Sequence, residues 1–278
     1  MTGKRLLREE KESLAGLRSL VEVYEEVAAA RMQKVRGAVL ISRMYLEEML
    51  AVFGRVREAY KKKGFSGLAK NGRQVAVFLS ANSGLFGDIV DRTFDKFAQF
   101  IKESDCDAVV VGKLGVRMMA DRGVNKLYNY YDFPDDNVDP ESFLLIMRYL
   151  LQFEKIVVFY GKFGSILTQN PVMTAVSGEN LEVAVTGEKI EYIFEPTIEE
   201  IAKIFEGQIM TSLFEQTLHE SQLAKFASRL LNLDKSWENI GKRLTVVDRE
   251  EVRLRRKTRN RKQLSTISGM SLWWRGGV

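Results

Sequence analysis

Apolar residues near the N-terminus recur at alternating three- and four-residue steps. Such spacing gathers side chains on one side of an α-helix and is typical of a seam that pairs with another helix. The pattern predicts a first helix from about Arg5 to about Lys63. The positions of its seam are Leu14, Leu17, Val21, Tyr24, Ala28, Val35, Ala38 and Tyr45, with Arg31 and Ser42 as interruptions.

The last third of the chain repeats this spacing and predicts a second long helix. It should begin near Thr197, whose hydroxyl can cap the first turn. All four prolines fall between Pro134 and Pro196. Because proline inside a helix costs about 3 kcal/mol, both outer segments can stay helical without a break. The stripe comprises Leu213, Thr217, Ser221, Ala224, Ala227, Leu231, Asp234, Trp237, Gly241, Leu244, Val247, Glu251 and Leu254.

The middle of the chain alternates β-rich and helical patterns. Runs at Arg73–Ser80, Asp107–Gly112 and Lys155–Tyr160 predict buried strands, with helices expected over residues 88–103 and 141–154. This alternation is typical of βαβ units around a mainly parallel sheet. A further hairpin is expected over residues 181–194, turning near Thr186-Gly187.

The expected fold class is therefore α/β. A long antiparallel coiled coil of the N- and C-terminal helices accompanies a Rossmann-like α/β domain with a mainly parallel sheet. The predicted division assigns residues 1–63 to the N-terminal coiled-coil helix and 64–196 to the α/β domain. Residues 197–278 then form the C-terminal coiled-coil helix and tail.

Composition argues against several kinds of site. The 278 residues are 45% hydrophobic and 28% charged, as in an ordinary soluble protein, with no apolar run of membrane-spanning length. The start lacks an apolar signal core, so a cytosolic protein, or one at the cytosolic face of a membrane, is expected. Cys106 and His219 are the only cysteine and histidine. A single cysteine cannot form an internal disulfide, and a single histidine cannot anchor a typical zinc site. A catalytic triad would have to use His219, but we expect both residues to be structural.

The glycine-containing loops lack the signatures of a phosphate site. Ser83–Asp88 follows a strand and precedes a helix but matches neither common phosphate-binding pattern, and Asp88 would repel a phosphate. Gly112–Gly115 and Gly161–Gly164 are expected to be strand-end turns. The acidic Asp132–Asp139 segment lacks the spacing of a metal loop and is expected to be solvated. The sequence thus predicts no catalytic residue, cofactor or metal.

The net charge of +5 is concentrated in the block Arg253–Lys262, which contains no acidic residue. Such a block can neutralise the phosphates of a nucleic acid, with Trp273 and Trp274 available for stacking. The other interpretations are a contact with acidic loops of a protein partner and a merely solvated face.

Five short segments, in order, resemble the gamma subunits of F-type ATP synthases. They are Glu26–Met32 (Glu-Val-Ala-Ala-Ala-Arg-Met), Ala81–Gly87 (Ala-Asn-Ser-Gly-Leu-Phe-Gly), Val111–Gly115 (Val-Gly-Lys-Leu-Gly), Tyr192–Pro196 (Tyr-Ile-Phe-Glu-Pro) and Glu220–Leu230. Each is short, but their order and spacing agree with the helix–domain–helix layout. The resemblance runs from about Leu14 to Gly269.

The resemblance implies a central-stalk rotor, a peripheral membrane component without catalytic chemistry of its own. Its implied partners are the alpha and beta subunits of a catalytic hexamer, a small epsilon-type stalk subunit and a membrane c-ring, at the cytoplasmic face of the cell membrane. Ion flow, such as hydrogen ion transport, would then be coupled to ATP synthesis or hydrolysis. A coiled-coil scaffold or nucleic-acid-binding protein is the alternative. The implied contacts with the F1 hexamer are Arg31, Lys34, Arg253, Arg255, Arg256, Arg259, Lys262, Leu272, Trp273 and Trp274.

Overall fold

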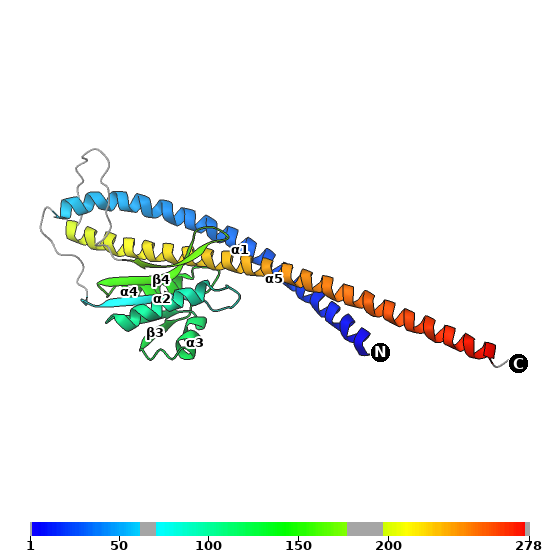
Figure 1. Cartoon of the computed structure of the whole chain (residues 1–278). Coiled ribbons are helices and arrows are strands. Elements are labelled where there is room, and N and C mark those ends of the chain that lie inside the picture. The colour runs from blue at the N-terminus through cyan, green and yellow to red at the C-terminus, as the bar shows by residue number, and fades with distance from the viewer. Residues whose placement is uncertain (1, 62–70, 177–196, 276–278) are drawn as a thin grey trace. The chain divides into compact units, whose positions relative to one another are not determined.

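Two long helices dominate the computed structural model, which describes residues 2–61, 71–176 and 197–275 (Figure 1). They are α1 (Thr2–Lys61) and α5 (Ile198–Arg275). The Thr197 hydroxyl accepts a hydrogen bond of 3.3 Å from the Glu200 amide, which confirms the predicted N-terminal cap of α5. The hairpin predicted over residues 181–194 lies outside the described residues. The proposed domain boundaries at 63/64 and 196/197 stay predictions.

The chain divides into two compact units. The terminal unit consists of Met1–Val27 and Leu233–Val278, and the central unit of Ala28–Asn232. In the terminal unit, Glu10 pairs with Arg243 at 2.6 Å, and the guanidinium of Arg18 lies 4.2 Å from the ring centroid of Trp237. The residue numbers of the partners decrease along α5 as they increase along α1, so the two helices pair antiparallel.

The central unit contains the same antiparallel pairing of α1 with α5. Arg43 pairs with Glu220 at 2.7 Å, and the rings of Phe53 and Phe205 stack at 6.3 Å. Figure 1 shows these stretches of the two helices side by side. The predicted coiled coil is therefore confirmed.

The seam of α1 differs from the predicted one at every second position. Ala28 and Val35 are buried as expected, whereas Leu17, Tyr24 and Tyr45 are about half exposed. Among the buried and half-buried side chains of α1, one set follows a strict alternation of four and three residues. This observed seam is Leu14, Arg18, Val21, Glu25, Ala28, Met32, Val35, Val39, Ser42, Leu46, Met49 and Phe53. On α5 the predicted stripe holds, except that Asp234 is exposed.

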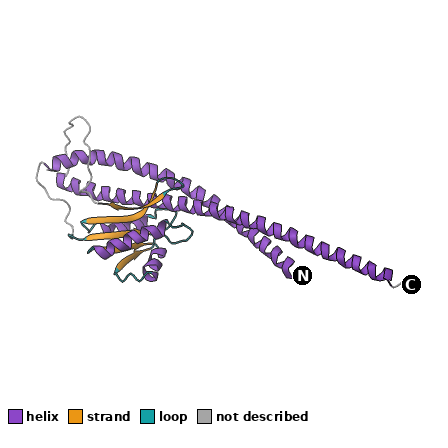
Figure 2. Ribbon diagram, in the orientation of Figure 1, coloured by secondary structure: helices purple, strands orange, loops and turns teal. Residues whose placement is uncertain are grey.

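A five-stranded sheet forms the centre of the central unit (Figure 2). Its order is β3-β2-β1-β4-β5, and every pairing is parallel except that of β5 with β4. The strands are β1 (Gln74–Leu79), β2 (Asp107–Val111), β3 (Tyr128–Tyr131), β4 (Lys155–Phe163) and β5 (Gln169–Ala175). The predicted Rossmann-like, mainly parallel sheet is confirmed.

Helices cover both faces of this sheet. They are α2 (Ile89–Glu103), α3 (Lys113–Asp121) and α4 (Pro140–Leu150). α2 and α3 enclose one apolar core with Phe78 and Phe159, whereas α4 encloses another with Val77 and Val158. α5 contributes to both cores. This doubly wound arrangement is the one that right-handed crossovers, the general rule for parallel strands, produce when the chain winds outward on both sides of β1.

Three elements escaped the sequence patterns. The segment predicted as a turn at Gly112–Gly115 instead opens α3, and β3 lies within a stretch expected to be loop. β5 had no counterpart among the expected strands. α3 and β3 are only nine and four residues long, and β3 is an edge strand, so their patterns are short and only partly apolar.

Candidate functional site

The carboxyl edge of the sheet is where the candidate site lies. The loop after β1 (residues 80–88) and the loop after β3 (residues 132–139) meet there, because both strands run in the same direction. In open α/β sheets ligands bind in the crevice beyond this edge, where the winding of the chain reverses. Here the reversal occurs between β1 and β4. α5 packs against this point, and all its residues from Ser221 to Arg229 are buried.

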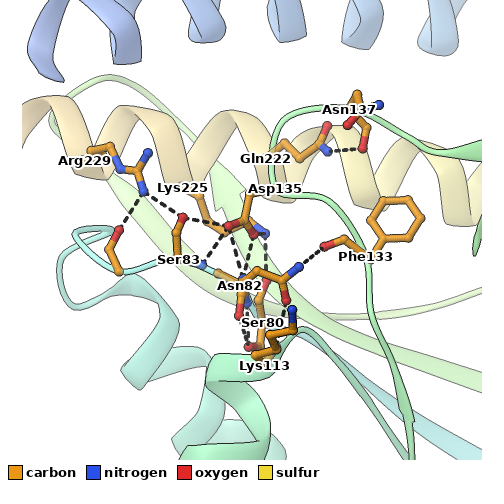
Figure 3. A network of polar contacts seen from close by, with 12 residues as sticks. Ser80, Asn82, Ser83, Lys113, Phe133, Asp135, Asn137, Gln222, Lys225 and Arg229 are labelled. Carbon is orange, nitrogen blue, oxygen red and sulfur yellow. Dashed lines mark hydrogen bonds and ion pairs between the residues drawn. The ribbon is translucent and has the colours of Figure 1, made fainter. Parts of the chain in front are cut away.

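Asp135 is the hub of the polar contacts at this edge (Figure 3). Its carboxylate accepts hydrogen bonds from the amides of Asn82 and Ser83, each at 2.9 Å, and from the Ser83 hydroxyl at 2.7 Å. Its side chain is only 10% exposed. Asp135 therefore fixes the conformation of the loop after β1, and the expectation of a uniformly solvated acidic segment is wrong at this residue.

Lys225 brings α5 into the same network. Its ammonium donates a hydrogen bond of 2.7 Å to the carbonyl of Ser80 and lies 4.0 Å from the Asp135 carboxylate. Burial lowers the pKa of Lys225 to about 8, although Asp135 opposes this shift. A buried lysine keeps its charge only where acceptors surround it. Lys225 thus ties α5 to the ends of β1 and β3.

Arg229, one turn further along α5, holds the glycine-containing loop. Its guanidinium donates to the Ser83 hydroxyl at 3.0 Å and to the Gly84 carbonyl at 2.6 Å, and it lies 3.9 Å from the ring centroid of Phe86. Gly87 has φ +64°, and a Cβ there would overlap the side chain of Asn232 on α5. The loop after β1 therefore packs closely against α5, in agreement with its prediction as a structural turn.

Asn82 extends the network to α3. Its side-chain oxygen accepts from the amide of Lys113 at 2.9 Å, and its side-chain nitrogen donates to Asp132 at 2.6 Å. Lys113 and Asn82 together hold the pKa of Asp132 below its ordinary value. Asp139, in turn, caps α4 by accepting from the Ser142 amide at 2.9 Å. Three aspartates of the predicted solvated loop therefore have specific structural partners.

A second polar cluster joins α1 to α5 and β4. Glu220, only 4% exposed, pairs with Arg43 at 2.7 Å and accepts a 3.3 Å hydrogen bond from the hydroxyl of Tyr160. Burial raises the pKa of Tyr160 to about 12, and the Glu220 carboxylate adds to the rise. The buried carboxylate thus has a cation from one helix and a donor from the sheet.

The contact residues predicted from the sequence fall into two groups in different units. Arg31 and Lys34 lie on α1 in the central unit, where Arg31 is 3.5 Å from Asp136. The basic block lies on α5 in the terminal unit. Its members Arg253, Arg256, Arg259 and Lys262 are exposed, and Arg255 pairs with Glu251 at 2.5 Å. The side chains of Leu272, Trp273 and Trp274 lie outside the described set.

Sequence reasoning considered Asp135 only as one member of the acidic Asp132–Asp139 segment and gave no role to Lys225 or Arg229. A signal was nevertheless present, because two of the segments that carried the family resemblance, Ala81–Gly87 and Glu220–Leu230, meet in this network. Their contact required the fold to be known. Cys106 is buried in the core beside α2, as predicted, and burial raises the pKa of its thiol.

The part of the chain that the structure describes holds no group of three metal-binding side chains. Among the helices of that part, none combines the length and apolar character needed to cross a membrane.

Comparison with known proteins assigns a family. The family model described as ATP synthase matches residues 4–262. An ATP synthase gamma chain of Pelotomaculum thermopropionicum is 24% identical over 281 residues, covering 97% of this chain and 98% of its own. One from Caulobacter sp. is 23% identical, covering 92% and 95%.

Solved structures agree on the fold. A chain of the Euglena gracilis mitochondrial ATP synthase (OSCP/F1/c-ring, rotational state 3) aligns with a TM-score of 0.69 at 14% identity, covering 98% of this chain and 95% of that one. A chain of the Tetrahymena thermophila mitochondrial ATP synthase, from its central stalk and c-ring, aligns with a TM-score of 0.55 at 17% identity, covering 78% and 98%. The chain described here belongs to the ATP synthase family, the family of these gamma chains.

Proposed function

We propose that this chain is the gamma-type rotor of a rotary ATP synthase or ATPase, the central-stalk subunit that links an ion-carrying ring to a catalytic hexamer. The observation that carries the proposal is the junction at the carboxyl edge of the sheet. There Lys225 and Arg229 fix α5 to the α/β body through hydrogen bonds, buried at Lys225 and part-buried at Arg229. A torque applied to the body would pass into α5 at these contacts.

The same junction supports the proposal that the chain has no catalytic site or cofactor of its own. The crevice that nucleotide-binding α/β proteins use is filled by α5 in the central unit. The loop after β1 also lacks a phosphate-binding motif. Any ATP chemistry would then belong to the partner subunits of the complex.

The proposed partners follow from the family. Alpha and beta subunits would form the hexamer around the coiled coil, and an epsilon-type subunit with the c-ring would contact the α/β body. The complex would lie at the cytoplasmic face of the cell membrane. An asymmetric shaft that turns inside the hexamer favours a different conformation at each catalytic site, so rotation changes their affinities for nucleotides.

The contacts proposed with the hexamer are the basic side chains and the C-terminal tail. The exposed cations of the basic block are free of the two cores and suit acidic loops of a partner. The proposed set keeps Arg31, Lys34, Arg253, Arg255, Arg256, Arg259, Lys262, Leu272, Trp273 and Trp274.

A charge reversal tests this interface. We expect Arg253→Glu combined with Arg255→Glu to leave folding intact, because both side chains are exposed, yet to weaken ATP-driven ion pumping in reconstituted vesicles. A matched control makes the same charge change on the α/β body, at the exposed Arg117 and Arg148. Unchanged pumping by the first double variant would contradict the assignment of these arginines, and an equal loss in the control would show that the effect is not specific to the basic block.

The nucleic-acid alternative has no support among the relatives described above. Purification from cells separates the two functions. A rotor elutes with the subunits of a hexameric ATPase. A nucleic-acid-binding protein instead elutes without them and loses nucleic acid steeply as the salt concentration rises.

A further inference from the structure

A cavity of about 360 Å³ opens between α1, α5 and the loop that leads into α4. It lies entirely in the central unit and adjoins the network around Asp135, because the Gln222–Asn137 hydrogen bond drawn in Figure 3 lies in its wall. Its size is in the range of small-ligand sites in proteins. Ala38 and Phe143 contribute apolar wall, whereas Asp136, Glu215 and Gln222 contribute polar wall.

Two buried hydrogen-bond acceptors in this wall lack a partner among the described residues. Gln222 is only 3% exposed; its side-chain nitrogen donates to the carbonyl of Asn137 at 3.2 Å, whereas its side-chain oxygen accepts no hydrogen bond from the described part of the chain. The Nδ1 atom of His219 is also buried, and no described residue forms a hydrogen bond with it. With the ring proton on Nε2, which faces the Glu215 carboxylate at 3.7 Å, Nδ1 is an acceptor.

The formal charges around the cavity balance but are unevenly placed. Glu215 and Asp136 bring two carboxylates to the cavity, and Lys34 brings one cation. Arg31, 3.5 Å from Asp136, supplies a second cation on that side. Among the described residues, Glu215 has a polar contact only with His219, so the negative potential is local to Glu215, and the unpaired lone pairs of Gln222 and His219 add to it.

We propose that this cavity binds an organic cation, an ammonium or guanidinium group on a short aliphatic stem. The cationic head lies at Glu215, and the stem lies against Ala38 and Phe143. The same chemistry is available from a free amine or from a lysine or arginine side chain of a partner subunit. This inference does not depend on the rotor function, since it rests on the cavity alone.

His219 provides a direct readout, because it is the only histidine in the chain. The untagged full-length chain is titrated with butylguanidinium, and the imidazole proton signals of His219 are followed by NMR. Pentanamide and pentanoate, a neutral and an anionic ligand of similar size, are titrated in parallel. We expect a saturable shift with butylguanidinium at a Kd of about 1 mM, and binding at least roughly tenfold weaker for the other two.

Two variants locate the binding site. Glu215→Gln removes the charge beside His219 and should weaken butylguanidinium binding roughly three- to tenfold. Glu200→Gln, the same change at an exposed position of α5, should leave it within about twofold. Ala38→Phe fills the cavity and should abolish the shift. No saturable shift, equally tight binding of pentanoate, or unchanged affinity in Glu215→Gln would overturn the proposal.

A second measurement separates the two sources of the cation. Labelled agmatine, a guanidinium on a four-carbon amine stem, is dialysed against the isolated chain and against the assembled complex, each as wild type and as Glu215→Gln. Retention that depends on Glu215 in both preparations identifies a free amine as the occupant. Retention in the isolated chain alone identifies a partner side chain that already fills the cavity. Retention unaffected by Glu215 in the isolated chain would contradict the site.

Discussion

Removing the Asp135 carboxylate should loosen the junction between α5 and the sheet. In Asp135→Ala, the amides of Asn82 and Ser83 lose their acceptor, and Lys225 loses its counter-ion while still buried. Hydrogen bonds to a charged group contribute about 1.5–3 kcal/mol each, and breaking a buried ion pair from one side costs about 3–5 kcal/mol. Because these terms overlap, we expect a loss of roughly 4 kcal/mol in the free energy of unfolding.

A double-mutant cycle with Lys225→Met isolates the part of this loss that comes from the ion pair. Unit charges about 4 Å apart interact by about 4 kcal/mol at an effective dielectric constant near 20, and desolvation offsets much of this. The double variant should therefore be more stable than the sum of the single losses predicts, by about 1–2 kcal/mol.

Urea unfolding of the full-length chain, followed by circular dichroism, measures these differences. Asp121→Ala, at an exposed position on α3, is the control and should stay within about 0.5 kcal/mol of wild type. Hydrogen exchange adds a local readout, since amides in residues 80–88 should exchange faster in Asp135→Ala. A loss no larger than that of the control, with unchanged exchange in this loop, would refute the reasoning.

Three further predictions concern other parts of the fold. Since the folded-state pKa of Lys225, about 8, lies below its ordinary 10.5, the unfolded chain binds more protons between these pH values. The free energy of unfolding of wild type, relative to that of Lys225→Met, should thus be lowest below pH 8 and rise toward pH 10.5. Urea unfolding of both proteins from about pH 7.5 to 9.5 measures this, and a constant difference between their free energies of unfolding would contradict it. Gly112→Ala should lower the free energy of unfolding by about 3 kcal/mol or more, because φ is +97° and a Cβ would lie 2.8 Å from the backbone of Ala81. Gly123→Ala, with φ +62° and open space around it, should lower it by only about 1 kcal/mol. Equal shifts of the melting temperature in the two variants would be evidence against this packing. Leu46→Ala should cost about 2–4 kcal/mol and Leu40→Ala less than about 1, since Leu46 is 6% exposed and Leu40 54%. The reverse order of urea midpoints would contradict the observed seam.

Helical periodicity was enough to place both long helices, and β-rich apolar runs placed the three central strands of the sheet. It could not fix the phase of the α1 seam, because neighbouring positions offer apolar residues in two registers, as at Ala38-Val39 and Tyr45-Leu46. Elsewhere a charged residue occupies the seam in place of an apolar neighbour. Arg18 lies inward because its guanidinium stacks on Trp237, while Leu17 is half exposed.

The candidate site was less predictable than the fold. Asp135, Lys225 and Arg229 are ordinary surface residue types, and a single sequence gives no sign that they are buried. Their roles arise because the loops after β1 and β3 converge at one edge and α5 returns to it from far along the chain. That convergence is a property of the sheet order and of the chain's long-range packing, which local patterns do not encode.

Rotation is the property that the proposed function demands most directly. A cysteine at the exposed position 117 of α3 carries a visible probe, while the native Cys106 is buried. The labelled chain is assembled with the catalytic subunits of its own complex, which are fixed to a surface, and ATP is added. The account predicts continuous turning of the probe in one direction, which stops when ATP is removed. A probe that stays stationary while the assembled complex hydrolyses ATP would contradict it.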